Sequence, residues 1–234
     1  GHYARGRSDR ATGRFQILKA CDQARDQSYF LFELGQDQLA MAVFPLGGMH
    51  KDEVRSIAAR RGLPNAGKPD SMDICFVPDG DYREFVRREA GDTGPPGDLV
   101  DTHDRVLGRH AGLAGYTVGQ RRGLGVQSDR PLYVVALDPG SNRVIVGEDR
   151  EQYRSALIAE RVNWVSIERP AGPIEAVAHI RSTHAGAGAA IEALDGGRMR
   201  VVFDRPQRAI TPGQAVVLYQ DDLLLGGGFI REAV

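Results

Sequence analysis

Apolar residues occur along this chain in short runs that are separated by polar, glycine-containing or proline-containing turns. The clearest helical pattern lies in KDEVRSIAARRGL, residues 51–63, where Val54, Ile57 and Ala58 fall on one face. Acidic residues stand in the first turn of this segment, arginines stand in its last turn, and Gly62 follows. The pattern therefore predicts an amphipathic helix that ends at this glycine.

Several other short apolar segments predict elements in the first part of the chain. FQIL, residues 15–18, is typical of an edge strand, and SYFLFEL, residues 28–34, predicts a helix with Ser28 as its N-cap. ICFV, residues 74–77, predicts a short buried strand, and DYREFVRREAG, residues 81–91, predicts a second amphipathic helix. Helices and strands are thus expected to alternate here.

The second half of the chain has the pattern of a β protein. From Val106 onward short strands and turns alternate, and DPGSN, residues 138–142, stands between two valine-rich runs as a hairpin signal. A boundary is expected near residue 152, and the part that follows predicts a small antiparallel barrel of four to six strands. The segments expected to form these strands are ALIAERVNWV, IEAVAHIRST, AAIEAL, MRVVFD, QAVVLYQ and LLLGGGFI.

Composition and charge narrow the classes of function. The chain has 30 lysines and arginines against 31 aspartates and glutamates, so a nucleic-acid partner would need a local basic surface. It has 29 glycines and 12 prolines, which favours a turn-rich β protein. No apolar run approaches the about 20 residues of a membrane span, and two cysteines without a signal peptide indicate a reducing, cytoplasmic setting. Common ATP-loop, dinucleotide, zinc-protease and serine-hydrolase motifs are missing from the sequence.

Cys75 lies inside the ICFV run, and the residues around it leave two interpretations open. A cysteine between two large apolar residues is usually packed in a core. A position near the end of a short strand instead suits a reactive thiol. The neighbouring Asp70 and Asp73 would raise the pKa of a thiol, so a reactive Cys75 would need a cation such as Lys68. Cys21, in a polar loop, is interpreted as incidental.

Polar groups at three other places are candidates for RNA contacts. Arg25, Asp26 and Gln27 form a compact polar trio, which is either a solvated loop or a set of groups for phosphate and a base edge. GQRRG, residues 119–123, is a basic turn with a weak phosphate-binding signal. Arg181 in a barrel strand faces either solvent or an RNA backbone, and the residues around it do not decide between the two.

Read in order, seven motifs resemble the bacterial tRNA-specific 2-thiouridylases, the MnmA or TrmU family. The motifs are GHYAR, RDQSYFL, FPLG with KDEVRSIAARRGL, KPDSMDICF, YTVGQRRGLG, the NW of RVNWVS, and AITPGQ with the later LGGGFI. They extend from the first residue to near the last. The resemblance implies a fold of three parts: an α/β remnant of a PP-loop (adenine nucleotide alpha hydrolase-like) domain, a small mixed central domain and a C-terminal antiparallel β-barrel.

The resemblance also implies an activity, a tRNA-uridine 2-sulfurtransferase reaction at the wobble uridine, position 34. ATP, with Mg²⁺ expected, activates the C2 oxygen by adenylation, and sulfur arrives through a relay protein as a cysteine persulfide. The persulfide cysteine of the family lies in a D-x-C-F motif, here Asp73 to Phe76, which assigns that role to Cys75. A first cysteine in the N-terminal domain then forms a disulfide with it.

The family's binding residues carry over to individual positions of this sequence. Gly1 matches a glycine that contacts ATP. The positions that match tRNA contacts are His2, Arg25, Asp26, Gln27, Arg181, Ser182 and Gln214. Arginine at position 25 replaces the usual lysine, so the charge is kept but the donor geometry differs. Ser182 stands where the family has an aromatic residue.

Some family features are missing from these residues, and the missing features limit the expected activity. The SGGVDSS ATP loop and the first catalytic cysteine should precede GHYAR, and the sequence contains neither. We therefore expect this chain alone not to thiolate tRNA. The expected domains are residues 1–78, with a helical insertion at about 41–63 that belongs to the central domain, then 79–152 and 153–234. The alternative to a sulfurtransferase is a non-catalytic module that binds RNA or protein through its barrel, with Cys75 in the core.

Overall fold

The computed structural model of the chain describes residues 2–67 and 94–234. The described residues form two compact units. The first contains residues 2–67 together with 155–206 and 211–234, and the second contains residues 94–154 and 207–210. The predicted strand at 74–77 and the predicted helix at 81–91 lie outside the described residues.

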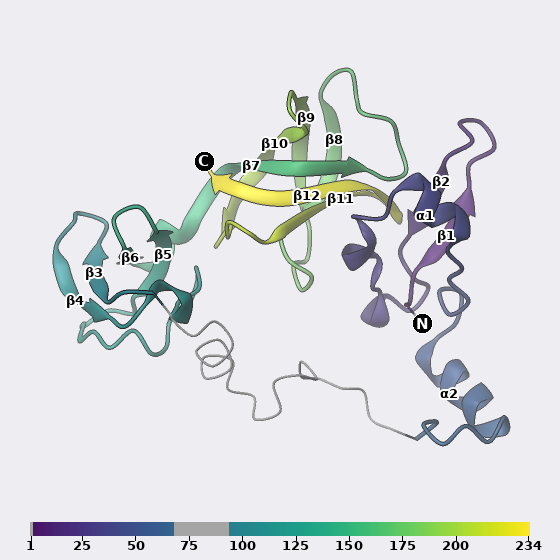
Figure 1. The fold of residues 1–234 in the computed structure, drawn as a ribbon, viewed down its shortest axis with the longest axis horizontal. Coiled ribbons are helices and arrows are strands. Elements are labelled where there is room, and N and C mark those ends of the chain that lie inside the picture. Colours follow the sequence, from purple (N-terminus) through teal and green to yellow (C-terminus); the bar gives the residue numbers. More distant parts are fainter. Residues whose placement is uncertain (1, 68–93) are drawn as a thin grey trace. The chain divides into compact units, whose positions relative to one another are not determined.

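A six-stranded antiparallel barrel, as the sequence predicts, is formed within residues 153–234 (Figure 1). Its strands are β7 (Tyr153–Trp164), β8 (Ile174–His179), β9 (Ala187–Leu194), β10 (Arg198–Arg208), β11 (Ala215–Gln220) and β12 (Leu223–Ala233). The neighbours follow the order β12-β11-β8-β9-β10-β7, and β12 pairs again with β7 to close the barrel. In β10 the buried Met199, Val201 and Phe203 alternate with exposed residues, which is the period of two that one buried sheet face requires.

The N-terminal part of the chain joins this barrel through a hairpin. β1 (Arg5–Ser8) pairs with β2 (Phe15–Leu18), and β2 in turn pairs with β12 through Leu18 opposite Leu223 and Ile17 opposite Leu224. The prediction of an edge strand at residues 15–18 was therefore wrong, because β2 has a neighbour on both sides. β1 was missed because its RGRS sequence is polar and mostly exposed.

Side chains from the hairpin region and the barrel share one hydrophobic core. Phe32 and Leu39 from the N-terminal part pack with Val217 and Leu224 from the barrel. The buried members of this core are Ala4, Ile17, Leu31, Phe32, Leu39, Val165, Val217, Tyr219 and Leu224. The first unit therefore folds from segments at both ends of the sequence.

The helical segments of the first unit are short. They are the 3₁₀ turns η1 (Gln23–Arg25) and η2 (Ser28–Leu31) and the helices α1 (Gln36–Met41) and α2 (Lys51–Arg60). α2 confirms the predicted helix, with the Glu53 carboxylate accepting a hydrogen bond from the His50 backbone N–H at 2.7 Å and Gly62 at φ 67° behind its end. The predicted helix from Ser28 is only one 3₁₀ turn, and its N-cap residue is Gln27.

The second unit has a four-stranded sheet within residues 94–154, in the order β4-β3-β6-β5. Its elements are β3 (Gly97–Asp101), β4 (Val106–His110), η3 (Leu113–Gly115), β5 (Tyr133–Asp138), β6 (Arg143–Gly147) and η4 (Asp149–Gln152). The predicted hairpin at DPGSN is confirmed, because Asp138 Oδ1 accepts the Gly140 N–H at 3.0 Å and Asn142 adopts φ 53°. The segment around GQRRG, which was expected to contain strands, is η3 followed by loop.

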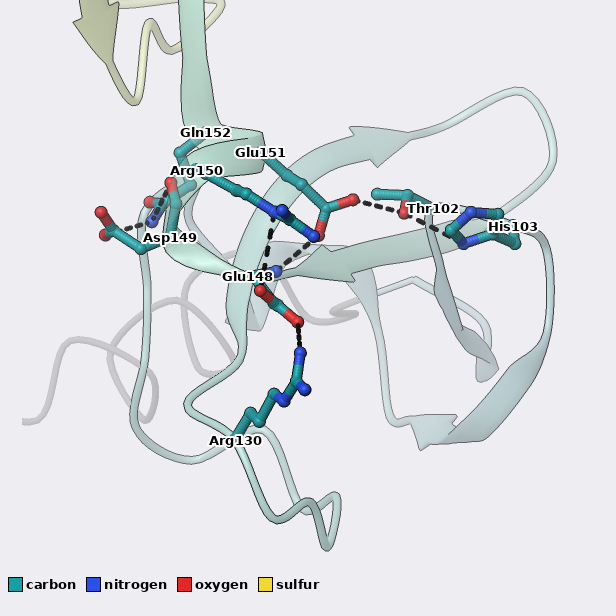
Figure 2. Close-up of polar contacts among 8 residues, drawn as sticks. All are labelled: Thr102, His103, Arg130, Glu148, Asp149, Arg150, Glu151 and Gln152. Atoms are coloured by element: carbon teal, nitrogen blue, oxygen red, sulfur yellow. Dashed lines mark hydrogen bonds and ion pairs between the residues drawn. The ribbon is translucent and has the colours of Figure 1, made fainter.

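Polar side chains fix the turn at η4, as Figure 2 shows. The Glu151 carboxylate accepts a hydrogen bond from the Thr102 hydroxyl at 2.6 Å and one from the Glu148 backbone N–H at 2.7 Å. Arg130 pairs with Glu148 at 2.6 Å, and Gln152 donates to Asp149 at 3.0 Å. These contacts fix the end of β6 before the chain enters β7.

Candidate nucleic-acid interface

Asp26 organises the loop between the two 3₁₀ turns. Its Oδ1 accepts the backbone N–H of Ala20 at 2.8 Å and that of Ser28 at 3.3 Å, and its Oδ2 accepts the Ser28 hydroxyl at 2.7 Å. Both carboxylate oxygens are thus occupied by donors from the chain itself. The carboxylate holds the trio in a fixed shape.

Gln27 ties the trio to the first residues of the chain. Its backbone N–H donates to the Tyr3 carbonyl at 2.8 Å, and its side-chain Oε1 accepts the Tyr3 N–H at 3.0 Å. Tyr3 follows His2, which is exposed. Two predicted site residues, His2 and Gln27, are therefore close to one another.

Tyr219 of β11 contacts this loop through its hydroxyl group, and Lys19 and His179 pack against its ring. Its hydroxyl is 2.9 Å from the Ser28 hydroxyl, and the Lys19 ammonium lies 4.4 Å from the centre of its ring. The His179 ring packs edge-on against the same ring, with centroids 5.1 Å apart. Burial raises the pKa of Tyr219, so its hydroxyl stays protonated and remains a hydrogen-bonding group.

The environment of His179 disfavours the protonated form of its ring. Burial is the largest cause of its lowered pKa, and the nearby Lys19 charge lowers it further. Its Nδ1 lies 2.8 Å from the carbonyl oxygen of His184, so the proton of the neutral ring is on Nδ1. Its Nε2 is buried and has no hydrogen-bond partner among the described residues.

Tyr29 connects the trio to the end of the barrel. Its hydroxyl donates to the Ala215 carbonyl at 2.9 Å, directly after Gln214. Burial raises the pKa of Tyr29 to about 12, and the positive charge of Arg181 acts in the opposite direction. Because Val217 of β11 is opposite His179 of β8, Arg181 follows β8 at the end of the barrel where β11 begins.

The turn before β11 presents Gln214 at this same end of the barrel. The Gly213 N–H donates to the Ile230 carbonyl at 2.8 Å, and the Ile230 N–H donates to the Gln214 carbonyl at 2.7 Å. The backbone is therefore anchored, while the Gln214 side chain is exposed. Ser182, also exposed, directly follows Arg181.

The structure thus brings the trio, His2, Arg181, Ser182 and Gln214 to one region of the first unit. The region offers guanidinium groups of Arg25 and Arg181 beside amide groups, a combination that suits RNA phosphates and base edges. Sequence reasoning missed the linking roles of Lys19 and Tyr29. Tyr29 belongs to an apolar run that was interpreted as a helix, and nothing nearby in the sequence indicates its bond to Ala215.

Other predicted site residues are not placed by the structure. Gly1 and Cys75 lie outside the described residues. Cys21 is exposed, and its backbone N–H donates to the Gly47 carbonyl at 2.9 Å. Within residues 2–67 and 94–234 no group of three histidine, cysteine, aspartate or glutamate side chains is arranged to hold a metal ion. No helix in the same ranges is long and apolar enough to cross a membrane.

The basic GQRRG turn lies in the second unit and is held by its own contacts. Gly119, at φ 90°, donates its N–H to the Val134 carbonyl at 2.8 Å, and Val134 returns an N–H to the Gln120 carbonyl at 2.9 Å. The Gln120 side chain closes the turn by donating to the Arg122 carbonyl at 2.9 Å. These bonds explain the glycine and glutamine without an RNA contact.

Comparison with known sequences divides the chain among three domain families. Residues 1–79 match the tRNA methyl transferase HUP domain, residues 83–148 match the tRNA methyl transferase PRC-barrel domain, and residues 154–230 match the aminomethyltransferase beta-barrel domain. Together these matches cover all three parts of the expected architecture.

Curated relatives are similar to the chain over nearly all of its residues. A tRNA-specific 2-thiouridylase MnmA of Solibacter usitatus is 48% identical over 239 residues, covering 99% of this chain and 64% of the relative. The corresponding protein of Moorella thermoacetica is 49% identical over 231 residues, covering 99% of this chain and 65% of the relative. MnmA 2 of Syntrophus aciditrophicus is 42% identical over 254 residues, covering 100% of this chain and 74% of the relative. The chain spans less than two thirds of the length of the first two.

Proposed function

The chain belongs to the MnmA family of tRNA-specific 2-thiouridylases, and from that premise we propose that its 234 residues hold the tRNA and carry the sulfur for 2-thiolation of the wobble uridine. The observation that supports this most directly is the convergence around Tyr29. There the Tyr29 hydroxyl joins the N-terminal part, which carries the Arg25–Gln27 trio, to Ala215 of the barrel. Gln214 and Arg181 lie at this same end of the barrel. These segments are far apart in sequence, and a shared binding surface is a functional reason for their meeting.

The proposed roles in RNA binding follow from the chemistry of each side chain. Arg25 and Arg181 pair with phosphates near the target nucleotide, and Gln27 and Gln214 offer amide groups to bases or riboses. His2 lies beside Gln27 through Tyr3 and adds a ring donor. Ser182 offers a hydroxyl in place of an aromatic ring. Asp26 keeps the loop in shape. Its carboxylate already accepts three hydrogen bonds from the chain, so it can contact RNA only through a remaining oxygen lone pair.

Cys75 is the proposed sulfur carrier. Its thiolate attacks the terminal sulfur of a persulfide on the relay protein, so the donor sulfur–sulfur bond breaks, a new one forms at Cys75 and the donor leaves as a thiolate. On the uridine, the C2–oxygen bond breaks with adenylate as leaving group, and a C2–sulfur bond forms. Before this, the thiolate of the family's first cysteine attacks Sγ of the Cys75 persulfide and forms a disulfide with it. The terminal sulfur leaves as hydrosulfide and is the sulfur that bonds to C2.

ATP supplies the adenylate in this scheme, with Gly1 as the proposed contact. Mg²⁺ would accompany ATP in this scheme. We further propose family domains at residues 1–78, 79–152 and 153–234, and a cytoplasmic setting where tRNA is present. The helical segment at about 41–63, expected to belong to the central domain, lies in the first unit with the barrel.

Sulfur transfer tests the role of Cys75, and Cys21 offers a matched control. The purified chain is incubated with a persulfide-loaded donor protein, and intact mass spectrometry follows the gain of one sulfur atom. The wild type and Cys21→Ser should gain the sulfur, and Cys75→Ser should not. A Cys75 that stays inert in the folded chain, while tRNA binding is intact, would favour the non-catalytic binding module instead.

Thiolation by the chain alone tests the limit of the proposal. The chain is incubated with ATP, Mg²⁺, a persulfide donor and unmodified tRNA, and nucleosides are analysed by mass spectrometry. We expect tRNA binding without 2-thiouridine. The appearance of 2-thiouridine would show that these residues contain a complete catalytic apparatus.

A further inference from the structure

Phe30 is a large apolar side chain that the fold leaves in solvent. It is 61% exposed, although its neighbours Ser28 and Leu31 in η2 are buried. A 3₁₀ turn repeats every three residues, so Ser28 and Leu31 share the inward face and Phe30 lies off it. The exposure of Phe30 therefore follows from the fixed phase of this turn.

The ring of Phe30 is held in place. Its centroid lies 5.3 Å from that of Tyr29, with the two rings inclined at 83°, and Tyr29 is anchored by its hydrogen bond to Ala215. The Phe30 backbone N–H donates to the Gln27 carbonyl at 3.1 Å. The ring thus follows the Arg25–Gln27 trio by one turn, in an orientation set before any ligand arrives.

The surroundings of Phe30 favour a nucleobase as its occupant. Residues 25–27, three to five positions before it, are polar, with Arg25 exposed and Asp26 and Gln27 partly exposed. The adjoining Tyr29 is bonded to Ala215 at the barrel end where Arg181 follows β8. A protein partner would require a contiguous apolar patch around the ring. An unpaired base instead needs one aromatic face beside cations that contact its phosphate.

We propose that Phe30 is a stacking platform for an unpaired base of the anticodon loop, adjacent to the nucleotide that the trio holds. This inference rests on the proposed function, since it takes the RNA to be tRNA. It adds a base-stacking contact that orients the loop, separate from the phosphate contacts of the arginines. Stacking of this kind tolerates any base, so the platform positions the loop without selecting its sequence.

The test uses an anticodon stem-loop in which each unpaired base in turn is replaced by fluorescent 2-aminopurine, whose emission falls when it stacks. The wild-type chain should quench one position strongly. Phe30→Trp should keep this quenching, Phe30→Leu should reduce it, and Phe30→Ala should abolish it and weaken binding by about 5- to 150-fold. Val43→Ala, which alters a side chain that is 83% exposed in the same unit, is the control and should bind as the wild type does.

The outcomes separate this inference from the proposed function. One outcome would overturn the platform alone: Arg181→Ala weakens stem-loop binding, while Phe30→Ala and Phe30→Leu change neither the affinity nor the quenching. A wild-type chain that does not bind the stem-loop would overturn both. Circular dichroism of each variant shows whether the fold is retained, and Phe30→Trp carries the test if the smaller residues unfold the chain.

Discussion

At the residue scale, the hydrogen bonds of Asp26 give it a structural function that is independent of RNA. Its carboxylate joins Ala20 to Ser28 and so fixes the loop that presents Arg25 and Gln27. The same Ser28 hydroxyl reaches Tyr219 of the barrel at 2.9 Å. A change at Asp26 should therefore affect stability and RNA affinity together.

Replacing Asp26 by asparagine should lower the free energy of unfolding by about 1–3 kcal/mol, because the charged acceptor of these bonds is lost. Chemical denaturation measures this change, and stem-loop affinity should fall in parallel. Asp37→Asn, at an exposed position in the first turn of α1, is the matched control. Equal stability of Asp26→Asn and wild type would contradict the structural role.

His179 predicts how stability depends on pH. Its folded pKa lies below the unfolded value of 6.5 because of burial and the Lys19 charge, while the His184 carbonyl and Asp26 act in the opposite direction. The unfolded chain then binds more protons than the folded chain between these two pKa values. The stabilisation is complete above about pH 6.5 and is lost as the pH falls from there toward the folded pKa.

Unfolding of His179→Asn should therefore be less sensitive to acid between about pH 8 and about pH 5 than unfolding of the wild type. Asparagine keeps a donor near the His184 carbonyl but does not titrate. Thermal melts across the pH range measure the difference. Parallel stability curves for the two proteins would show that His179 titrates as it does in the unfolded chain.

At the element scale, β12 shows why its three consecutive glycines are needed. A Cβ on Gly227 would lie 2.7 Å from the Phe32 ring and 2.8 Å from the Val216 carbonyl oxygen, and one on Gly228 would lie 2.8 Å from the Glu160 carbonyl. β12 pairs with both β11 and β7 here, and Phe32 packs onto it from the N-terminal part. The glycines thus permit three elements to approach one strand.

Gly227→Ala should destabilise the chain by about 1–3 kcal/mol, because neither the ring nor the backbone oxygen has room to move. Denaturant titration measures the effect. Gly172→Ala is the control, since a Cβ at that loop position meets nothing within 4 Å. If Gly172→Ala lowered the free energy of unfolding as much as Gly227→Ala, the cost would come from backbone conformation alone.

The elements that the sequence predicted are those with a local signal. The helix at Lys51–Arg60 has acidic residues at its start and a glycine behind its end, and the barrel strands alternate as one-sided strands do. β1 has no such pattern and forms only because β2 pairs with it. Likewise, the turn at Ser28–Leu31 is anchored by the hydrogen bond from Tyr29 to Ala215, 186 residues later. No nearby residue in the sequence indicates this bond.

The candidate site was predictable to a different extent. The trio, Arg181 and Gln214 were named from the motifs of the family. Their individual surroundings favoured a solvated loop for the trio, indicated only a turn at Gln214 and did not decide for Arg181. Their convergence could not be predicted from the sequence, because it depends on the pairing of β8 with β11 and on the hydrogen bond of Tyr29 to Ala215. Cys75 stays a prediction outside the described residues.

At the scale of the whole molecule, the hairpin of β1 and β2 makes the N-terminal part and the barrel one folding unit. Ile17 is fully buried opposite Leu224, and both belong to the shared core. Arg5 adds an ion pair to Asp222 at 2.7 Å, which is partly exposed and contributes little. The proposed RNA-binding surface can keep its shape only while this unit stays intact.

Ile17→Ala should cost about 2–5 kcal/mol and should loosen both partners of the pairing. Hydrogen exchange followed by mass spectrometry should show faster exchange in Phe15–Leu18 and in Leu223–Ala233 together. Val106→Ala, 62% exposed in the second unit, should change neither. Faster exchange in the hairpin alone would mean that the barrel is stable without it.

The central claim is that the wobble uridine lies between the trio and the barrel end. Its most direct test places photoreactive 4-thiouridine at the wobble position of the stem-loop, irradiates the complex with the chain and maps the cross-linked peptides. We predict cross-links within residues 19–30, 179–184 or 211–219, and their loss when unlabelled stem-loop competes. Cross-links confined to α2 or to the second unit would contradict the claim.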